Sequence, residues 1–186
     1  MSRLWGDAMS KPESPLPVKP VVSLMLARAD LAVAAIRRLA EFFGPPDLVS
    51  PVWPYGVTEY YQPEMGPSLG RQLVAFLHLA DSSRLPDWKI ITNTWEGRFS
   101  LGGRRLVNLD PGYLTPDRLV LATGKNYAHR LYLGQGIFGD LVLQYRAGEF
   151  HDLPWSYPDY AQGPLPAYLL LARRKYLWQL ERLRKL

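Results

Sequence analysis

Three basic residues that could bind anions or move protons lie close together near position 130. Lys125, His129 and Arg130 fall within six residues, at a predicted turn and the start of the following strand. Lys125 and Arg130 could bind a phosphate or a carboxylate through charge-assisted hydrogen bonds. His129 could act as a general acid or base near neutral pH. The alternative is a hairpin that carries basic residues for solubility, with strand alternation sending His129 and Arg130 to opposite faces.

Carboxylates are spread over several segments that are also rich in aromatic residues. The candidates are Glu59, Glu64, Glu96, Asp110 and Asp140. Glu64, Glu96 and Asp110 are the predicted catalytic acids, together with His129. Their oxygens would suit a divalent cation such as magnesium, although the spacing defines no metal site. Asp110 could equally begin a turn, and Glu96 could pair with Arg98 or Arg105.

Asp140 lies in a predicted strand, where alternation places it between Phe138 and Val142 on one face. An acid between two apolar neighbours needs a buried partner or a ligand.

Polar residues at turns and strand ends complete the predicted site. Tyr61, Asn93 and Asn108 could orient a ligand by hydrogen bonding, beside Lys125 and Arg130 as the positive charges. Acids and bases together suit a phosphorylated ligand bound with a divalent cation. The alternative is that these groups pair with one another and only fix the loops.

Aromatic residues recur beside these polar groups and could stack on a base or a sugar ring, or could simply pack. They are Tyr55, Tyr60, Tyr61, Trp95, Tyr113, Tyr127, Trp155, Tyr157 and Tyr160.

Several known catalytic motifs are missing from the sequence. No phosphate-binding P-loop occurs, and Gly134-Gln135-Gly136 lacks the third glycine of a dinucleotide fingerprint. The sequence contains no cysteine, which excludes disulfides, thiolate metal sites and a cysteine nucleophile.

Hydrophobic periodicity predicts an α+β protein. We expect a disordered leader over 1–19 and a single domain over 20–186. Its antiparallel meander sheet of about five or six strands would be covered by two helices and closed by an amphipathic C-terminal helix. The expected helices are 30–43, 68–80 and 167–185. The expected extended segments are 21–26, 47–61, 88–92, 99–101, 104–109, 118–123, 129–133 and 137–145, with a turn at 110–112.

The net charge of +5 is confined to the C-terminal segment. Residues 167–186 hold six bases and one acid, so 16 bases balance 16 acids in the remainder. Such a body gives no strong nucleic-acid signal, but 167–186 could contact a protein or a membrane surface. No transmembrane segment or signal peptide is apparent, so we expect a cytoplasmic protein.

A family resemblance rests on several short sequence segments. Five of them are rich in polar residues and are called the polar phrases: 60–66, 92–96, 108–113, 125–130 and 155–160. The other two are 119–123 and 136–138. In this order they resemble the bacterial domain of unknown function 4416 family, from about residue 21 to 160. The sequence has Phe-Gly-Asp at 138–140 where the family has Tyr-Ala-Glu, and the shorter acid could serve the same purpose. The resemblance implies kinship and no particular reaction.

Two functions follow as hypotheses. The first is an enzyme or enzyme-like protein that binds a small anionic ligand, such as a nucleotide or a sugar phosphate. The second is a non-catalytic interaction module that uses the basic C-terminal helix. A concave pocket lined by the polar phrases would favour the first hypothesis.

Overall fold

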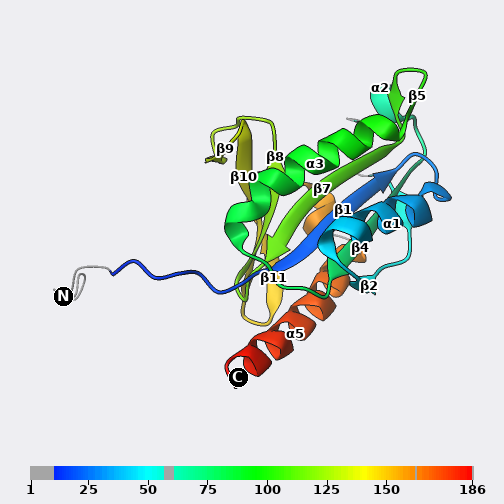
Figure 1. Cartoon of the computed structure of the whole chain (residues 1–186). Helices are drawn as coiled ribbons and strands as arrows, with labels where there is room; N and C mark the ends of the chain where they lie inside the picture. Colours follow the sequence, from blue (N-terminus) through cyan, green and yellow to red (C-terminus); the bar gives the residue numbers. More distant parts are fainter. Residues whose placement is uncertain (1–10, 57–60, 162, 186) are drawn as a thin grey trace.

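A large antiparallel β-sheet organises the chain (Figure 1). The computed structural model describes residues 11–56, 61–161 and 163–185, so Glu59 and Tyr60 lie outside the described residues. The helices are α1 (Leu31–Phe43), α2 (Gln62–Met65), α3 (Leu85–Arg98), α4 (Pro158–Ala161) and α5 (Leu165–Leu183), with a 3-10 turn over Ser82–Arg84. The strands are β1 (Lys19–Leu26), β2 (Pro46–Val49), β3 (Trp53–Tyr55), β4 (Leu69–Phe76), β5 (Ser100–Leu101), β6 (Arg104–Arg105), β7 (Val107–Leu114), β8 (Arg118–Thr123), β9 (Leu131–Gly134), β10 (Ile137–Arg146) and β11 (Glu149–Asp152).

The strand order of the main sheet is β11-β10-β8-β7-β1-β4-β2, with β3 also paired to β4 and β9 to β10. Strands β7, β8, β10 and β11 follow one another as a meander, which confirms the predicted α+β class. Among the described residues the sheet has nine strands, more than the five or six predicted. Strands β5 and β6 form a separate hairpin around Gly102-Gly103, at the predicted turn.

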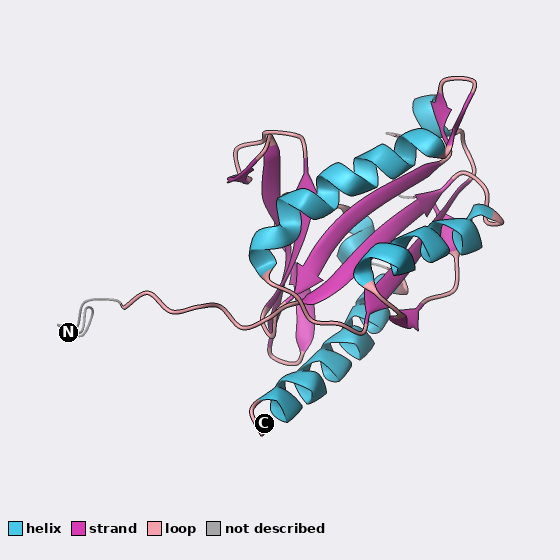
Figure 2. Cartoon of the chain, in the orientation of Figure 1, coloured by secondary structure: helices cyan, strands magenta, loops and turns pink. Residues whose placement is uncertain are grey.

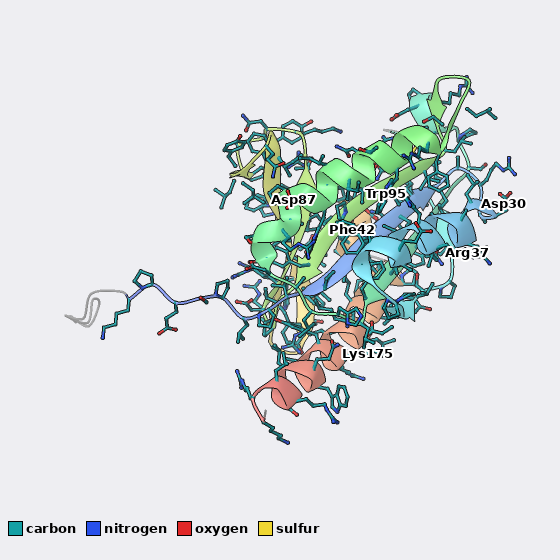
Figure 3. All side chains as sticks on the ribbon, viewed as in Figure 1. Asp30, Arg37, Phe42, Asp87, Trp95 and Lys175 are labelled. Atoms are coloured by element: carbon teal, nitrogen blue, oxygen red, sulfur yellow. The ribbon has the colours of Figure 1, made fainter. Side chains whose placement is uncertain are left out.

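Helices cover both faces of the sheet (Figure 2). Val22 and Leu24 of β1 face α1 and α3 in one hydrophobic core, whereas Val21 faces α5 in a second core. Phe42 of α1 and Trp95 of α3 lie edge to face between these two helices, with ring centroids 5.7 Å apart (Figure 3). The central strand β1 is therefore buried on both faces.

Two predicted elements have the wrong type. Residues 68–80 contain strand β4 rather than a helix, because β4 pairs with β1, β2 and β3 and tertiary pairing overrides a helix-like spacing of leucines. Residues 88–92 belong to helix α3 rather than to a strand. The buried positions of α3 recur with a helical period but include the charged residues Lys89 and Glu96. Because these two positions are not apolar, the sequence shows no continuous apolar stripe that would predict a helix.

The predicted turn at Asp110-Pro111-Gly112 is also wrong, because these residues continue strand β7. All three pair with β1, but pairing with β8 begins only at Gly112. Proline has no N–H to donate, and in sheets it occurs where one side of the ladder is open. The turn signal therefore marks the point where β7 and β8 separate.

The ordered structure begins before residue 20, where we predicted the start of the folded domain. Residues 11–17 form no helix or strand, but the Val18 N–H donates to the Ala80 carbonyl over 2.7 Å, and β1 begins at Lys19. The Lys19 ammonium is buried and donates to Asp47 Oδ2 (2.8 Å), the Phe76 carbonyl (3.0 Å) and Gln179 Oε1 (3.0 Å). These bonds connect β1 to the C-terminal helix.

Helix α5 packs on the sheet through Leu169, Ala172, Tyr176 and Leu180, as predicted. Leu183, which was expected on the same face, is half exposed beyond the packed part of the helix. Among the described residues, no helix is long and apolar enough to cross a bilayer.

Candidate functional site

A cavity of about 230 Å³ opens where strands β7 and β8 separate. The ladder between the two strands ends at the pair Gly112 and Leu121, and part of the cavity wall comes from the ends of β7 and β8 beyond it, which no longer pair with each other. The lining residues are Tyr55, Tyr61, Arg71, Lys89, Asn93, Arg105, Asn108, Asp110, Leu121, Ala122, Thr123, Gly124, Lys125, Arg130, Asp140, Val142, Tyr157 and Tyr160.

The register of the sheet brings the polar residues of three strands together. Arg71 of β4 and Asn108 of β7 lie on either side of Met25, so all three share one face. Asp140 of β10 pairs with Leu121, and Leu121 pairs with Gly112 on that same face. Helix α3 contributes Lys89 and Asn93, which line the cavity beside the gap between β7 and β8.

Arg71 is a buried cation in the wall of the cavity. Its side chain is 3% exposed, and its Nε donates to Asp159 Oδ2 over 2.7 Å. Its Nη2 donates to the same carboxylate oxygen. The guanidinium carbon lies 5.1 Å from the ring centroid of Tyr55 and 4.9 Å from that of Tyr160. Nη1 makes no hydrogen bond to a described residue, so Arg71 keeps donor capacity in the cavity that it lines.

Lys89 crosses from helix α3 to strand β7. Its ammonium donates to the Leu109 carbonyl (2.9 Å) and to Asp110 Oδ1 (3.2 Å), and lies 3.5 Å from Glu96 Oε1. Three acceptors match the three protons of an ammonium group. Asn108 donates to Asp110 Oδ2 over 2.6 Å, so both oxygens of Asp110 are held in place.

Arg105 joins two of the predicted catalytic acids. Its Nη1 donates to Glu96 Oε2 and to Asn108 Oδ1 (2.8 Å), and its Nη2 donates to Glu64 Oε2 over 2.8 Å. Its Nε is buried without a hydrogen-bond partner among the described residues. Glu96 also accepts a hydrogen bond from the Leu109 N–H over 2.8 Å and is nearly enclosed. Glu64 and Glu96 therefore contact Arg105 and are not themselves part of the cavity wall.

Asp110 is ionised at neutral pH. Burial acts to raise its pKa, but the charges of Lys89 and Arg71 and the hydrogen bonds from Lys89 and Asn108 outweigh burial, so the pKa lies below its ordinary value. Asp110 is thus a fixed hydrogen-bond acceptor in the cavity.

Arg130 and His129 both approach Asp140, contrary to the expectation that they point to opposite faces. Arg130 Nε and Nη2 lie 2.9 and 2.8 Å from Asp140 Oδ2, and Arg130 Nη1 donates to the Lys125 carbonyl over 3.0 Å. His129 Nε2 lies 3.7 Å from Asp140 Oδ1. Both residues precede β9, where strand alternation does not yet apply. Of the two expectations for Asp140, a buried partner or a ligand, the structure shows a partner, Arg130.

The segment that carries Tyr157 is held against an irregularity in β10. The pairing register of β10 with β8 shifts between Leu141 and Leu143. Trp155 Nε1 donates to the Leu141 carbonyl over 2.8 Å, and the Ser156 hydroxyl donates to the Val142 carbonyl. This anchoring places Tyr157 in the cavity wall.

Four tyrosines line the cavity, and burial keeps the phenols of three of them protonated at neutral pH. Burial raises the pKa of Tyr55 to about 12 and also raises the pKa of Tyr61 and Tyr160. Tyr157 is the fourth. Protonated phenols can both donate and accept hydrogen bonds.

All five predicted ligand-binding residues line the same cavity: Tyr61, Asn93, Asn108, Lys125 and Arg130. Among the predicted catalytic residues, only Asp110 does so. Glu64 and Glu96 contact Arg105, and His129 approaches Asp140. Their catalytic roles stay predictions, because placement does not test chemistry.

Sequence reasoning missed the buried cations of the cavity. Arg71 lies in an element predicted as a helix, and Lys89 in one predicted as a strand, so neither could be placed on the site face. The sequence offered no signal for Arg71, because its burial follows from the pairing of β4 with β1, β2 and β3. Asp159, its partner, lies in the polar segment 155–160, where its sequence neighbours do not distinguish it from a surface acid.

The charge of the cavity wall is positive. Five lining residues are basic and two are acidic, whereas the counter-charges Asp159, Glu64 and Glu96 are not among the lining residues. Among the described residues, no three His, Cys, Asp or Glu side chains come together as a metal site. Basic side chains therefore outnumber acidic ones in the wall, and these groups supply no preformed cation site.

Comparison with known proteins supports the kinship suggested by the polar phrases. No curated protein and no solved structure matches the chain. Residues 16–176 match the family described as domain of unknown function (DUF4416), and because this match spans most of the chain, the protein belongs to that family.

Proposed function

We propose that this protein is an enzyme or enzyme-like protein that binds a small phosphorylated ligand in the cavity between β7 and β8. The observation that carries the proposal is Arg71, a buried arginine in the cavity wall with one side bound to Asp159 and Nη1 without a protein acceptor among the described residues. Burying a charge is unfavourable unless it is paired and hydrogen-bonded. An anion in the cavity would complete the hydrogen bonding of this side chain.

The alternative is that the acids and bases only hold the loops together. Lys89 and Arg130 fit this view, because their donors reach protein acceptors. Arg71 and Arg105 do not, since each retains a nitrogen without a partner among the described residues. The Asn93 side chain also lines the cavity without a hydrogen bond to another described residue. Arg105 Nε is itself enclosed, so the spare donors of Arg71 and Asn93 are the ones that support ligand binding in addition to loop fixation.

The test is a thermal-shift and calorimetry panel of inorganic phosphate, sugar phosphates and nucleotides, each with and without magnesium. A ligand at 100 times its dissociation constant stabilises by about 2.7 kcal/mol, which raises the melting temperature by about 5–10 °C for a chain of this size. We expect at least one phosphorylated compound to reach this shift.

The test variant is Lys125→Ala, which changes an exposed residue of the cavity wall. The matched control is Arg37→Ala, which changes an exposed residue of α1 outside the cavity. Loss of a charge-assisted contact should weaken binding about 10- to 100-fold for Lys125→Ala. Arg37→Ala should bind normally. If no phosphorylated compound shifts the melting temperature, or both variants bind like the original protein, the proposal is wrong.

A second candidate function, contact with an anionic membrane surface, rests on the outer face of α5. Trp178 is 56% exposed and Leu171 46% exposed, and the Arg182 guanidinium lies 4.8 Å from the Trp178 ring centroid. Gln179 fixes the helix by donating to the Leu77 carbonyl over 2.6 Å. Tryptophan with surrounding cations suits the headgroup region of a bilayer.

Sedimentation with lipid vesicles tests this second function. The protein should pellet with vesicles that contain anionic lipid and stay in solution with zwitterionic vesicles. A variant with Arg174→Glu, Arg182→Glu and Lys185→Glu should lose this binding with an unchanged melting temperature. Failure of the original protein to bind at low salt leaves α5 with a packing role only.

A further inference from the structure

The cavity offers hydrogen-bonding groups rather than free aromatic faces, and this distinguishes two kinds of phosphorylated ligand. We infer that the ligand is a compact polyhydroxylated phosphate, a sugar phosphate, rather than a nucleotide. This inference rests on the proposed function and names the ligand class for the same cavity.

Arginine side chains of the protein already lie over the rings of three tyrosines at or near the cavity. The Arg71 guanidinium lies against the rings of both Tyr55 and Tyr160, which are buried to more than nine-tenths. Arg130 lies 4.4 Å from the ring centroid of Tyr127. A nucleobase is usually bound by stacking on an aromatic or guanidinium plane. Stacking on these rings would require Arg71 or Arg130 to leave its carboxylate partner.

Trp155, two residues before Tyr157 of the cavity wall, is likewise occupied by a neighbouring ring. The rings of Trp155 and His129 stack with centroids 5.0 Å apart and an interplanar angle of 11°. Tyr61 packs edge to face on Tyr55, with centroids 6.4 Å apart. The aromatic residues near the cavity thus contribute edges and hydroxyls more than open faces.

Hydroxyl and amide groups, by contrast, are available. The Tyr55 and Tyr157 hydroxyls and the Asn93 amide make no hydrogen bond to another described residue, and all three residues line the cavity. Asp110 adds an ionised acceptor held by Lys89 and Asn108. A sugar hydroxyl both donates and accepts, so phenols, an amide and a carboxylate match a polyol better than they match the flat face of a base.

The size of the cavity agrees with a compact ligand. Its volume of about 230 Å³ lies below the range of roughly 300–1,000 Å³ typical of sites for drug-sized molecules. The exposed Lys125 lies beyond the end of β8, whereas Tyr55 lies on β3, and β7, β1 and β4 separate these two strands in the sheet. We assign the phosphate to the Lys125 side and the hydroxyl groups to the tyrosine side, where an oxygen of the sugar accepts the hydrogen bond that Arg71 Nη1 has left to donate.

Isothermal titration with four probes tests the inference: inorganic phosphate, a pentose phosphate, a hexose phosphate and a nucleoside monophosphate. At least one sugar phosphate should bind about ten-fold or more tightly than both inorganic phosphate and the nucleotide. That ratio corresponds to a few net hydrogen bonds at about 0.5–1.5 kcal/mol each.

Two sets of variants separate the ends of the cavity. Tyr55→Phe combined with Tyr157→Phe removes only two hydroxyls, and should weaken sugar phosphate binding about ten-fold while leaving inorganic phosphate unchanged. Lys125→Ala should weaken both probes by a similar factor. Circular dichroism and the melting temperature show that the variants keep their fold.

The outcomes distinguish the inference from the proposal on which it rests. Tighter binding of the nucleotide, or equal binding of phosphate and sugar phosphates, overturns the sugar phosphate assignment and leaves anion binding in place. Binding of no phosphorylated probe overturns both. Unchanged sugar phosphate affinity in the double phenylalanine variant also contradicts the assignment.

Discussion

Arg71 occupies a position where most proteins place an apolar residue. It lies on β4, beside the edge strands β2 and β3, and is enclosed by two tyrosine rings and Asp159. A buried ion pair seldom adds net stability relative to apolar residues of similar shape, because both charges lose their hydration. Retaining a charged pair at this position is therefore easier to explain by ligand binding than by folding.

We expect removal of one member of this pair to be far more harmful than removal of both. Arg71→Met leaves the Asp159 carboxylate buried and unpaired, and should lower the free energy of unfolding by about 3–5 kcal/mol. Arg71→Met combined with Asp159→Leu should recover most of that loss. Urea unfolding of the two single variants and the double variant measures the coupling. Additive effects of the two changes would contradict the pairing.

Asp110 should make stability depend on pH in the acid range. Its pKa is lower in the folded protein than in the unfolded chain, so the unfolded chain takes up more protons as the pH falls. The stabilisation is complete above the unfolded value of about 3.9 and is lost as the pH drops through the lower folded pKa.

The measurement compares unfolding free energies of the original protein and Asp110→Asn between about pH 6 and pH 2. Their difference should shrink on acidification within the acid part of this range. Asp152→Asn, a change at an exposed aspartate of β11, serves as the control and should run parallel to the original protein. A constant difference for Asp110→Asn would show that this carboxylate is not held in its ionised form.

The separation of β7 and β8 creates the cavity, and Gly112 lies at the last pair before it. A Cβ atom at this position would lie 2.3 Å from the Val120 carbonyl oxygen and 2.4 Å from Leu121 Cδ2. The two strands can approach here only because glycine has no side chain. Pro111 then leaves the next position without an N–H, and the strands diverge.

A pair of glycine substitutions checks this account of the strands. Gly112→Ala should lower the free energy of unfolding by about 1–3 kcal/mol, because backbone atoms of β8 must move. Gly97→Ala, in open space on helix α3, should raise it by about 0.5–1 kcal/mol through better helix propensity. Thermal and urea unfolding measure both. Equal effects of the two changes would contradict the close approach of β8.

The two hydrophobic cores lie on opposite faces of one sheet and share strand β1. Because the same backbone supports both cores, neither can be lost without exposing the other. We therefore expect the folded part of the chain to unfold as one unit.

One substitution in each core tests this cooperativity. Leu39→Ala in α1 and Leu169→Ala in α5 remove fully buried side chains on opposite faces, and each should cost about 2–5 kcal/mol. Each variant should show a single transition that coincides by tryptophan fluorescence and far-ultraviolet circular dichroism. Two separated transitions would indicate independent cores instead.

Local patterns were sufficient for much of the fold. Helix α1 ends at Gly44 and the β5–β6 hairpin turns at Gly102-Gly103, all three with positive φ, because glycine adopts this conformation without strain. The α5 face is readable from Leu169, Ala172, Tyr176 and Leu180, since a docked helix needs one apolar stripe. The polar phrases likewise identified all five ligand-binding candidates that line the cavity.

The partners of the buried charged residues could not be predicted from local sequence patterns. Arg71 and Asp159 are 88 residues apart, and Lys89 reaches Asp110 across 21 residues, so each pair exists only after the strands have found their register. Local patterns report which residues face water or a core, because those preferences act between neighbours in the chain. The type of β4, the separation of β7 from β8 and the partners of the buried cations depend on contacts between distant segments, and those contacts form only in the folded protein.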